Sequence, residues 1–139
     1  MKYALILETD EYTRERFVKL VGWLGHTPVV ASSADEALTL MSVMSFELIF
    51  TPLHDLPNER RQLPGELKRI APKSVVIAIA ANDEEYTVTR FEPPIGACAV
   101  VPRHPSVELL RRLLASNIEG FGVHAAPTAP PVERRRIPK

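Results

Sequence analysis

The sequence predicts a three-layer α/β domain, in which helices cover both faces of a parallel β-sheet. Strand-like apolar runs alternate with segments of helical apolar spacing, five times over, before residue 119. A helical crossover between sheet neighbours is right-handed and leads to a parallel strand, and such strands are normally buried on both faces. The length of 139 residues and the 45% hydrophobic content suit one folded domain with one core.

The first part of the chain contains three strand signals and two helix signals. Apolar or β-branched runs predict strands at Tyr3–Leu7, Thr27–Ala31 and Glu47–Thr51. Between them, apolar residues at helical spacing predict a helix over Tyr12–Leu24 and a second over Ser33–Met44. The second helix opens with a Ser-x-x-Glu capping box, which satisfies amide groups at a helix start.

The second part continues the alternation, but its fourth helix is predicted to be short. Pro93 and Pro94 stand directly after the helical segment, and proline neither donates a backbone hydrogen bond nor fits inside a helix. The elements predicted here are a helix at Leu63–Ile70, a strand at Ser74–Ala81, a helix within Asp83–Phe91, a strand at Ala97–Val101 and a helix capped by Ser106.

Composition excludes several classes of protein. The formal net charge is zero, which argues against a dedicated nucleic-acid surface, and no apolar run reaches membrane-spanning length. The amino end also lacks the pattern of a signal peptide, so we expect a cytoplasmic protein. The single cysteine, Cys98, excludes an intrachain disulfide framework, and we expect it to pack as a small apolar side chain in its strand. We expect Trp23 at the edge of the core.

A change of composition at residue 120 predicts two regions, a folded domain over residues 1–119 and a disordered tail over residues 120–139. The tail contains four prolines and no periodic apolar pattern. Its four basic residues against one acid make it basic, so the body is mildly acidic. Such a tail could bind RNA, lipid or an acidic protein weakly, but we expect it to be solvated.

Several segments together resemble the response-regulator receiver domain. They are the fivefold strand–helix rhythm and the texts Leu5-Ile-Leu-Glu-Thr-Asp, Ala34-Asp-Glu-Ala-Leu and Phe46-Glu-Leu-Ile-Phe-Thr-Pro. The resemblance covers about residues 2 to 118. It implies a flavodoxin-like fold with strand order 2-1-3-4-5. In active members it also implies phosphorylation of an aspartate that follows the third strand.

The resemblance places a degenerate phosphorylation site at the carboxyl ends of the strands. The phosphoacceptor position falls at Pro52, or at Thr51 if the register slips by one, and neither residue is a carboxylate. The paired metal-binding acids of the family become Glu8 and Thr9, although Asp10 remains nearby. Aspartyl phosphorylation needs both the nucleophile and a metal held by carboxylates, so we expect a receiver without this chemistry.

Of the two remaining positions of the family site, one has lost its functional group and the other keeps it. Ala80 stands where receivers carry a hydroxyl residue, so the group that contacts the phosphoryl oxygen is lost. A basic side chain survives after the fifth strand as Arg103. Arginine forms planar contacts with carboxylates and stays charged, so we expect Arg103 to pair with Glu8 or Asp10 as an internal substitute for the metal.

These observations predict a pseudo-receiver, a non-enzymatic interaction module of two-component signalling without cofactor or metal. Because a short tail follows the domain, we expect its output to pass through a protein partner or a homodimer. The expected interaction face comprises Phe91, Glu92, Pro93, Pro94, Val100, Arg103 and Arg111.

The alternative is a flavodoxin-like domain whose strand-edge pocket binds a small anion or a metal. His54, Asp55 and His104 lie at the same predicted edge as Arg103 and the acids after the first strand. We expect Asp55 to stabilise a turn and the two histidines to be polar surface, so this function ranks below the interaction module.

Overall fold

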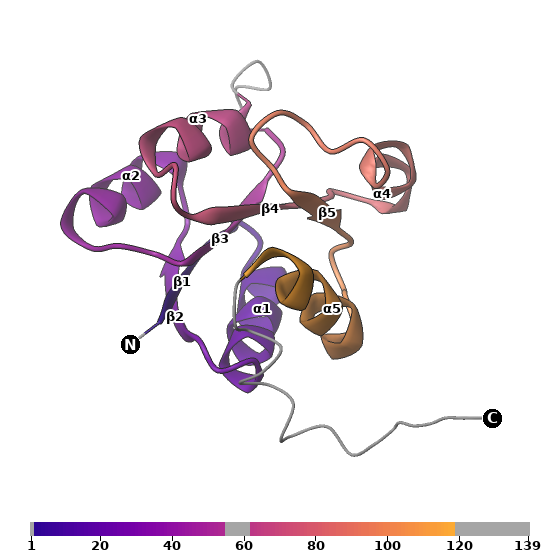
Figure 1. Cartoon of the computed structure of the whole chain (residues 1–139), viewed down its shortest axis with the longest axis horizontal. Helices are drawn as coiled ribbons and strands as arrows, with labels where there is room; N and C mark the ends of the chain where they lie inside the picture. Colours follow the sequence, from indigo (N-terminus) through magenta and orange to yellow (C-terminus); the bar gives the residue numbers. More distant parts are fainter. Residues whose placement is uncertain (1, 55–61, 119–139) are drawn as a thin grey trace. The chain divides into compact units, whose positions relative to one another are not determined.

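A parallel five-stranded sheet in the order β2-β1-β3-β4-β5 organises the chain (Figure 1). The predicted α/β fold and strand order are therefore confirmed. The computed structural model describes residues 2–54 and 62–118. The strands are β1 (Tyr3–Leu7), β2 (Thr27–Ala31), β3 (Leu48–Pro52), β4 (Val75–Ile79) and β5 (Ala99–Val101).

Five helices accompany the strands, and side chains cap most of their amino ends. The residue before α1, α2, α4 and α5 is an Asp, Ser or Asn whose side chain accepts a hydrogen bond from the amide three residues on. Helix α3 instead carries a proline in its first turn. The helices are α1 (Glu11–Trp23), α2 (Ala34–Val43), α3 (Leu63–Ile70), α4 (Asp83–Thr89) and α5 (Val107–Asn117).

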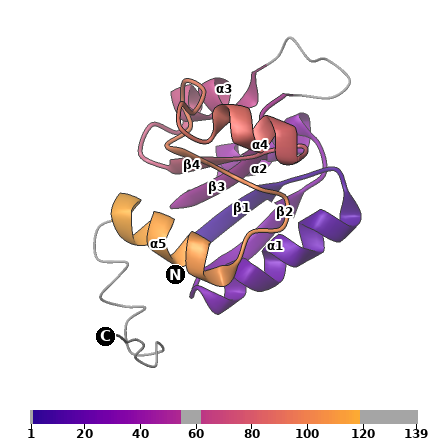
Figure 2. The same cartoon turned by 90° about the vertical axis from the view of Figure 1, so that its right-hand side faces the viewer.

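The core of residues 1–105 lies on both faces of the sheet (Figure 2). Helix α1 covers one face, where Phe17 packs against Phe50 with ring centroids 5.1 Å apart. Helices α2 and α3 cover the other face over buried residues such as Leu5 and Ile49. Near β5 the same face continues as a small cluster beneath Tyr86 of α4. The sheet with a helical layer on each side makes the predicted three layers.

The fourth helix is short, as predicted, and it ends at Thr89, before the two prolines. No residue within α4 is fully buried. Two expectations about burial were wrong. Trp23 is the last residue of α1 and is 69% exposed, whereas Leu20, Val21 and Leu24 on the other side of the helix are buried. Cys98 directly precedes β5 and is exposed, although its amide already donates to the Val76 oxygen of β4.

The described residues divide into two compact units, one that ends at Pro105 and one that begins at Ser106. In the second unit the described element is α5, whose cap, Ser106, accepts a hydrogen bond from the Leu109 amide at 3.0 Å. The predicted tail and its boundary at residue 119 lie outside the described residues and stay predictions. Within the described ranges, every helix is too short or too polar to cross a bilayer.

A close backbone approach fixes the loop between α4 and β5. Gly96 has a φ of +97°, a conformation that L side chains rarely adopt. A Cβ atom at Gly96 would lie 2.5 Å from the Pro64 carbonyl oxygen and 2.6 Å from the Gly65 Cα. The loop after α4 therefore rests against the first turn of α3, and a side chain at this position would separate them.

We predict that Gly96→Ala lowers the free energy of unfolding by about 2–4 kcal/mol, because it combines a strained φ with a backbone clash. The control is Gly22→Ala in α1, where a Cβ atom meets nothing within 4 Å. Gly22→Ala should raise the free energy of unfolding by about 0.5–1 kcal/mol, since alanine favours helix. Urea titrations of both variants measure the difference, and equal stabilities would contradict the close approach.

Candidate functional site

A cavity of about 230 Å³ opens at the carboxyl ends of the strands. Parallel α/β sheets place their sites at this edge, where loops from neighbouring strands converge. Every strand contributes to the lining. The lining segments are Leu7–Asp10 after β1, Ser32–Ala34 after β2, Pro52 and His54 at β3, Ile79–Ala81 at β4 and Arg103 after β5, joined by Leu63 at the start of α3.

Asp10 is the centre of a small hydrogen-bonded cluster at the mouth of this cavity. Its Oδ2 atom accepts hydrogen bonds from the Thr13 amide at 2.9 Å, the Thr13 hydroxyl at 2.7 Å and Arg103 Nη2 at 2.9 Å. Arg103 Nη2 also donates to the Thr13 hydroxyl oxygen at 2.6 Å. We call Asp10, Thr13 and Arg103 the Asp10 cluster. It ties the residue after β5 to the first turn of α1.

These contacts favour the charged form of Asp10. The two hydrogen bonds from Thr13 lower the pKa of the Asp10 carboxyl most, and the charge of Arg103 lowers it further. Because the pKa in the folded chain lies below that of the unfolded chain, the carboxylate stabilises the fold at neutral pH. This contribution is lost as the pH falls through the lowered pKa in the acid range.

Glu8 does not pair with Arg103, so the predicted ion pair involves Asp10 alone. Glu8 is buried, and its Oε2 atom accepts a hydrogen bond from the Asp10 amide at 2.9 Å. Arg14 donates to the backbone oxygen of Glu8 at 3.1 Å, and not to its carboxylate. Within residues 2–54 and 62–118, no basic side chain forms an ion pair with Glu8. The neighbouring Thr9 lines the cavity and is exposed.

The ends of β3 and β4 bring no reactive group to the cavity. Thr51 is fully buried, and its hydroxyl donates to the Pro52 carbonyl oxygen. Pro52 lines the cavity and pairs with Ile79 in the sheet. Of the two residues that the sequence placed at the phosphoacceptor position, Pro52 is therefore the one at the cavity. Ala80 adds only a methyl group to the lining.

The residues at this edge do not fit the metal ion that active receivers hold. In the part of the chain that the structure describes, no group of three or more His, Cys, Asp or Glu side chains could bind one. The Oδ2 atom of Asp10 already accepts three hydrogen bonds. Thr9 supplies no carboxylate at the next position. We therefore derive no metal chemistry at this edge.

The two loop histidines do not form a joint site. His54 lines the cavity, whereas His104 is exposed and contacts the Tyr12 ring edge-on with centroids 5.8 Å apart. The convergence of His54 and His104 that we considered is thus absent from the described residues. Asp55 lies outside the described residues.

Only some residues of the expected interaction face are exposed to solvent. Phe91 is 84% exposed and Glu92 is also exposed, while Pro93 and Pro94 are half-buried. Val100 is 5% exposed beneath α4, so its inclusion in the face was wrong. The error arose because β5 has no exposed side: Ala99, Val100 and Val101 are all buried.

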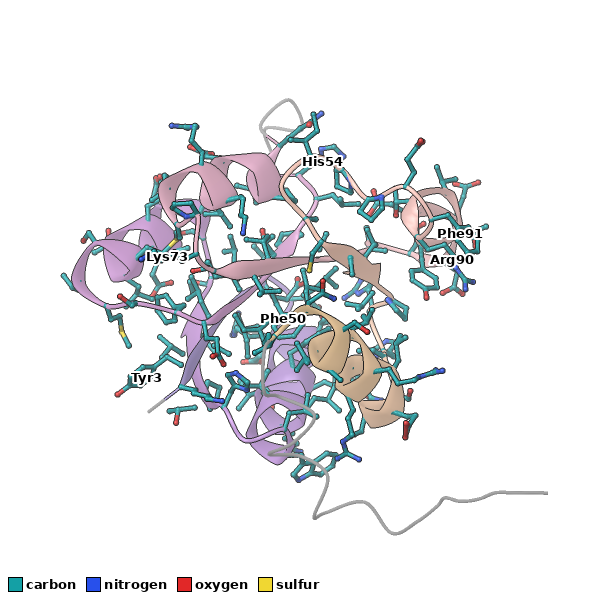
Figure 3. All side chains as sticks on the ribbon, in the orientation of Figure 1. Tyr3, Phe50, His54, Lys73, Arg90 and Phe91 are labelled. Atoms are coloured by element: carbon teal, nitrogen blue, oxygen red, sulfur yellow. The ribbon has the colours of Figure 1, made fainter. Side chains whose placement is uncertain are left out.

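The two arginines of the expected interaction face belong to other parts of the structure. Arg103 belongs to the Asp10 cluster, and Arg111 lies on α5 in the second unit. The structure adds Arg90, whose guanidinium lies over the rings of Tyr86 and Phe91, 5.2 and 4.6 Å from their centroids. Figure 3 shows Arg90 and Phe91 together at the end of α4.

Sequence reasoning missed Thr13 and Arg90. Thr13 stands three residues after Asp10, and this spacing is a helix-capping signal that could have revealed their hydrogen bond. Its contact with Arg103 joins residues 90 positions apart, which local patterns do not encode. Arg90 follows Tyr86 by four residues, a spacing that brings side chains together on a helix.

We predict that the members of the Asp10 cluster depend on one another for stability. Thr13→Val should lower the free energy of unfolding by about 1–2 kcal/mol, since it removes a buried hydroxyl that both donates and accepts. Arg103→Met should cost under about 1 kcal/mol, because the arginine is 36% exposed. The double variant should lose less than the sum by about 0.5 kcal/mol or more.

The control for this cycle is Thr13→Ser, which keeps the hydroxyl and should retain its coupling to Arg103. Chemical denaturation of the four chains measures each free energy. Strict additivity of Thr13→Val and Arg103→Met would show that the contact between them contributes nothing.

No protein-family model matches the chain, and no curated protein matches it significantly in sequence. Several solved structures are similar to it. The signal receiver domain of an HD domain-containing protein from Pseudomonas fluorescens has a TM-score of 0.70 at 16% identity, over 88% of this chain and 98% of that one. A response regulator from Thermotoga maritima, in complex with Mg²⁺ and BeF, has a TM-score of 0.68 at 16% identity, over 84% and 98%.

A third similar structure is a response regulator from Burkholderia pseudomallei with a phosphorylated aspartic acid, a calcium ion and citrate. Its TM-score is 0.63 at 21% identity, over 93% of this chain and 74% of that one. All three identities are low, so the likeness concerns the fold. The chain therefore has the fold of a response-regulator receiver domain.

Proposed function

We propose that this chain is a pseudo-receiver, a cytoplasmic and non-enzymatic protein-interaction module in two-component signalling that works without aspartyl phosphorylation. Its fold is that of receiver domains, and the similar chain from Burkholderia pseudomallei carries a phosphorylated aspartic acid. The observation that carries the proposal is Pro52 at the end of β3, where it lines the cavity in the position of a phosphoacceptor.

The chemistry of the cavity supports this reading. Transfer of a phosphoryl group to a carboxylate needs a nucleophile and a cation that neutralises the developing charge. Proline offers no nucleophilic atom, and the cavity has neither the metal ligands nor, at Ala80, a hydroxyl to contact a phosphoryl oxygen. With all three parts altered together, a change at one position does not restore the reaction.

The Asp10 cluster supports a single, permanent conformation. A metal ion or a phosphoryl group comes and goes, whereas the Arg103 guanidinium is covalently part of the chain and stays charged. It holds the end of β5 against the start of α1 through Asp10 and Thr13. We therefore infer that the chain presents one fixed surface to its partners rather than switching between two.

The surface that we assign to a partner is segment 88–95, which begins in the last turn of α4 and continues into the loop after it. Val88, Phe91 and Ile95 are 72%, 84% and 90% exposed, although each is a large apolar side chain. Arg90 packs on Phe91 and holds its ring in place. Exposed aromatic and arginine side chains are the groups that contribute most at protein interfaces. The partner is a protein, and a second copy of this chain is one form it can take.

The alternative, a site for a small anion, has less support. The charge of Arg103 is already compensated by Asp10 at 2.9 Å, and the Glu8 carboxylate lines the same cavity. An anion would meet this second negative charge without a free cation to offset it. The basic tail, as a weak nucleic-acid contact, stays a prediction.

We predict that the full chain takes up no phosphoryl group from acetyl phosphate with Mg²⁺. Intact mass spectrometry should show the unmodified mass, and beryllofluoride with Mg²⁺ should leave the backbone amide spectrum unchanged. The Thermotoga maritima response regulator, which forms such a complex, serves as the positive control. An added phosphoryl mass that disappears in Asp55→Asn would overturn the proposal by revealing a relocated nucleophile.

We predict that Phe91→Ser and Ile95→Ser each weaken partner binding or self-association by at least about tenfold, because each removes an exposed apolar anchor. The control is Val43→Ser on α2, which is 75% exposed but lies outside segment 88–95. Quantitative capture from the native host and light scattering of the purified chain measure the two modes. If all three variants bind equally well, segment 88–95 is not the interface.

A further inference from the structure

Among the described residues, the cavity at the strand ends combines apolar walls with a carboxylate that no cation pairs, and we propose that it binds a small organic ammonium ion with an apolar body. This inference is independent of the proposed interaction module. It concerns a concave cavity, whereas the module would bind its partner through the exposed segment 88–95. It rests on the surroundings of Glu8, on the charge balance of the lining and on the size and polarity of the walls.

Glu8 is a nearly buried carboxylate with one oxygen unused. The residue is 8% exposed, and Oε2 accepts the Asp10 amide. Among the described residues, Oε1 has no hydrogen-bond donor within reach, and no basic side chain pairs with the group. A charge withdrawn from water is costly without a partner. A cation in the cavity would supply that partner.

Among the described residues, the charged groups around Glu8 leave it without a counter-ion. Asp10 and Arg103 line the cavity and neutralise each other through their contact at 2.9 Å. Of the two carboxylates in the described lining, Glu8 is therefore the one that no basic side chain pairs. Just outside the lining, the positive charge of Arg14 is matched by the negative charge of Glu36. A ligand with a single positive charge therefore completes the balance, and an anion does not.

The walls favour an organic cation over a hydrated metal ion. Seven apolar residues of the described chain line the cavity: Leu7, Ala34, Pro52, Leu63, Ile79, Ala80 and Ala81. Metal ions such as Mg²⁺ and Ca²⁺ need about six oxygen ligands, which this set does not provide. The volume of about 230 Å³ is below the usual range of about 300–1,000 Å³ for drug-sized ligands. The cavity thus suits a fragment-sized amine with an aliphatic or aromatic body.

The test uses the full chain and three probes of matched shape: benzylammonium, benzyl alcohol and benzoate, with Mg²⁺ as a fourth. Titrations followed by backbone amide shifts should show saturable binding of benzylammonium, with the largest shifts in Leu7–Asp10, Ser32–Ala34 and Ile79–Ala81. Benzyl alcohol and benzoate should bind at least about tenfold more weakly, because they lack the charge that Glu8 requires.

Three variants test whether benzylammonium binds in this cavity. Glu8→Gln keeps an acceptor for the Asp10 amide and should weaken benzylammonium binding by about tenfold or more. Glu15→Gln removes the same charge from an exposed position on α1 outside the cavity and should leave binding unchanged. Ala81→Leu fills the rim from an exposed position and should also weaken binding, so the test holds even if Glu8→Gln fails to fold.

Three results would overturn the proposal. Benzoate or Mg²⁺ that binds in the cavity as tightly as benzylammonium would show that positive organic charge is not what the site selects. Equal affinities of wild type, Ala81→Leu and any folded Glu8→Gln would place binding elsewhere. A linear, non-saturating response to benzylammonium would show that the cavity does not take up a ligand of this class.

Discussion

The arrangement of the strand-end edge depends on a single oxygen atom, Oδ2 of Asp10. It caps α1 by accepting the Thr13 amide, and it accepts the Thr13 hydroxyl and Arg103 Nη2 as well. Capping sets the position of α1 relative to the end of β1, and the arginine brings the end of β5 to the same point. A helix start, two strand ends and the mouth of the cavity are thus positioned by one carboxylate.

That role is incompatible with metal binding at the same atom, since a carboxylate oxygen has a limited number of lone-pair directions. Receiver chemistry requires acids that remain available to a cation, and in the described part of this edge the available acid is Glu8. In the proposed pseudo-receiver, the proline at position 52 and the pairing of Asp10 with Arg103 belong together. Where no metal ion is bound, the permanent cation of Arg103 keeps Asp10 from being an unpaired charge.

The fold was predictable because the features that determine it are local. Continuous apolar runs indicate buried parallel strands, and Ser33 and Ser106 mark helix starts that the structure confirms. The errors occur where local patterns end. Trp23 is apolar but lies on the exposed side of α1, opposite Leu20, Val21 and Leu24, and Cys98 belongs to an apolar run yet its side chain is exposed. The close approach of Gly96 to Gly65 joins distant segments and left no pattern to recognise.

The sequence predicted which residues lie at the site, but not which of them contact one another. The residues at the strand ends follow from topology, and so does the neighbourhood of Arg103 and Asp10, but the choice of Asp10 over Glu8 does not. It depends on which carboxylate the first turn of α1 engages, and Thr13 decides this by offering two donors to Asp10. Glu8 instead accepts the Asp10 amide and lies beside apolar walls. A cavity persists there because neither the buried carboxylate nor the small side chains of Pro52 and Ala80 can fill the space that the receiver fold leaves at this edge.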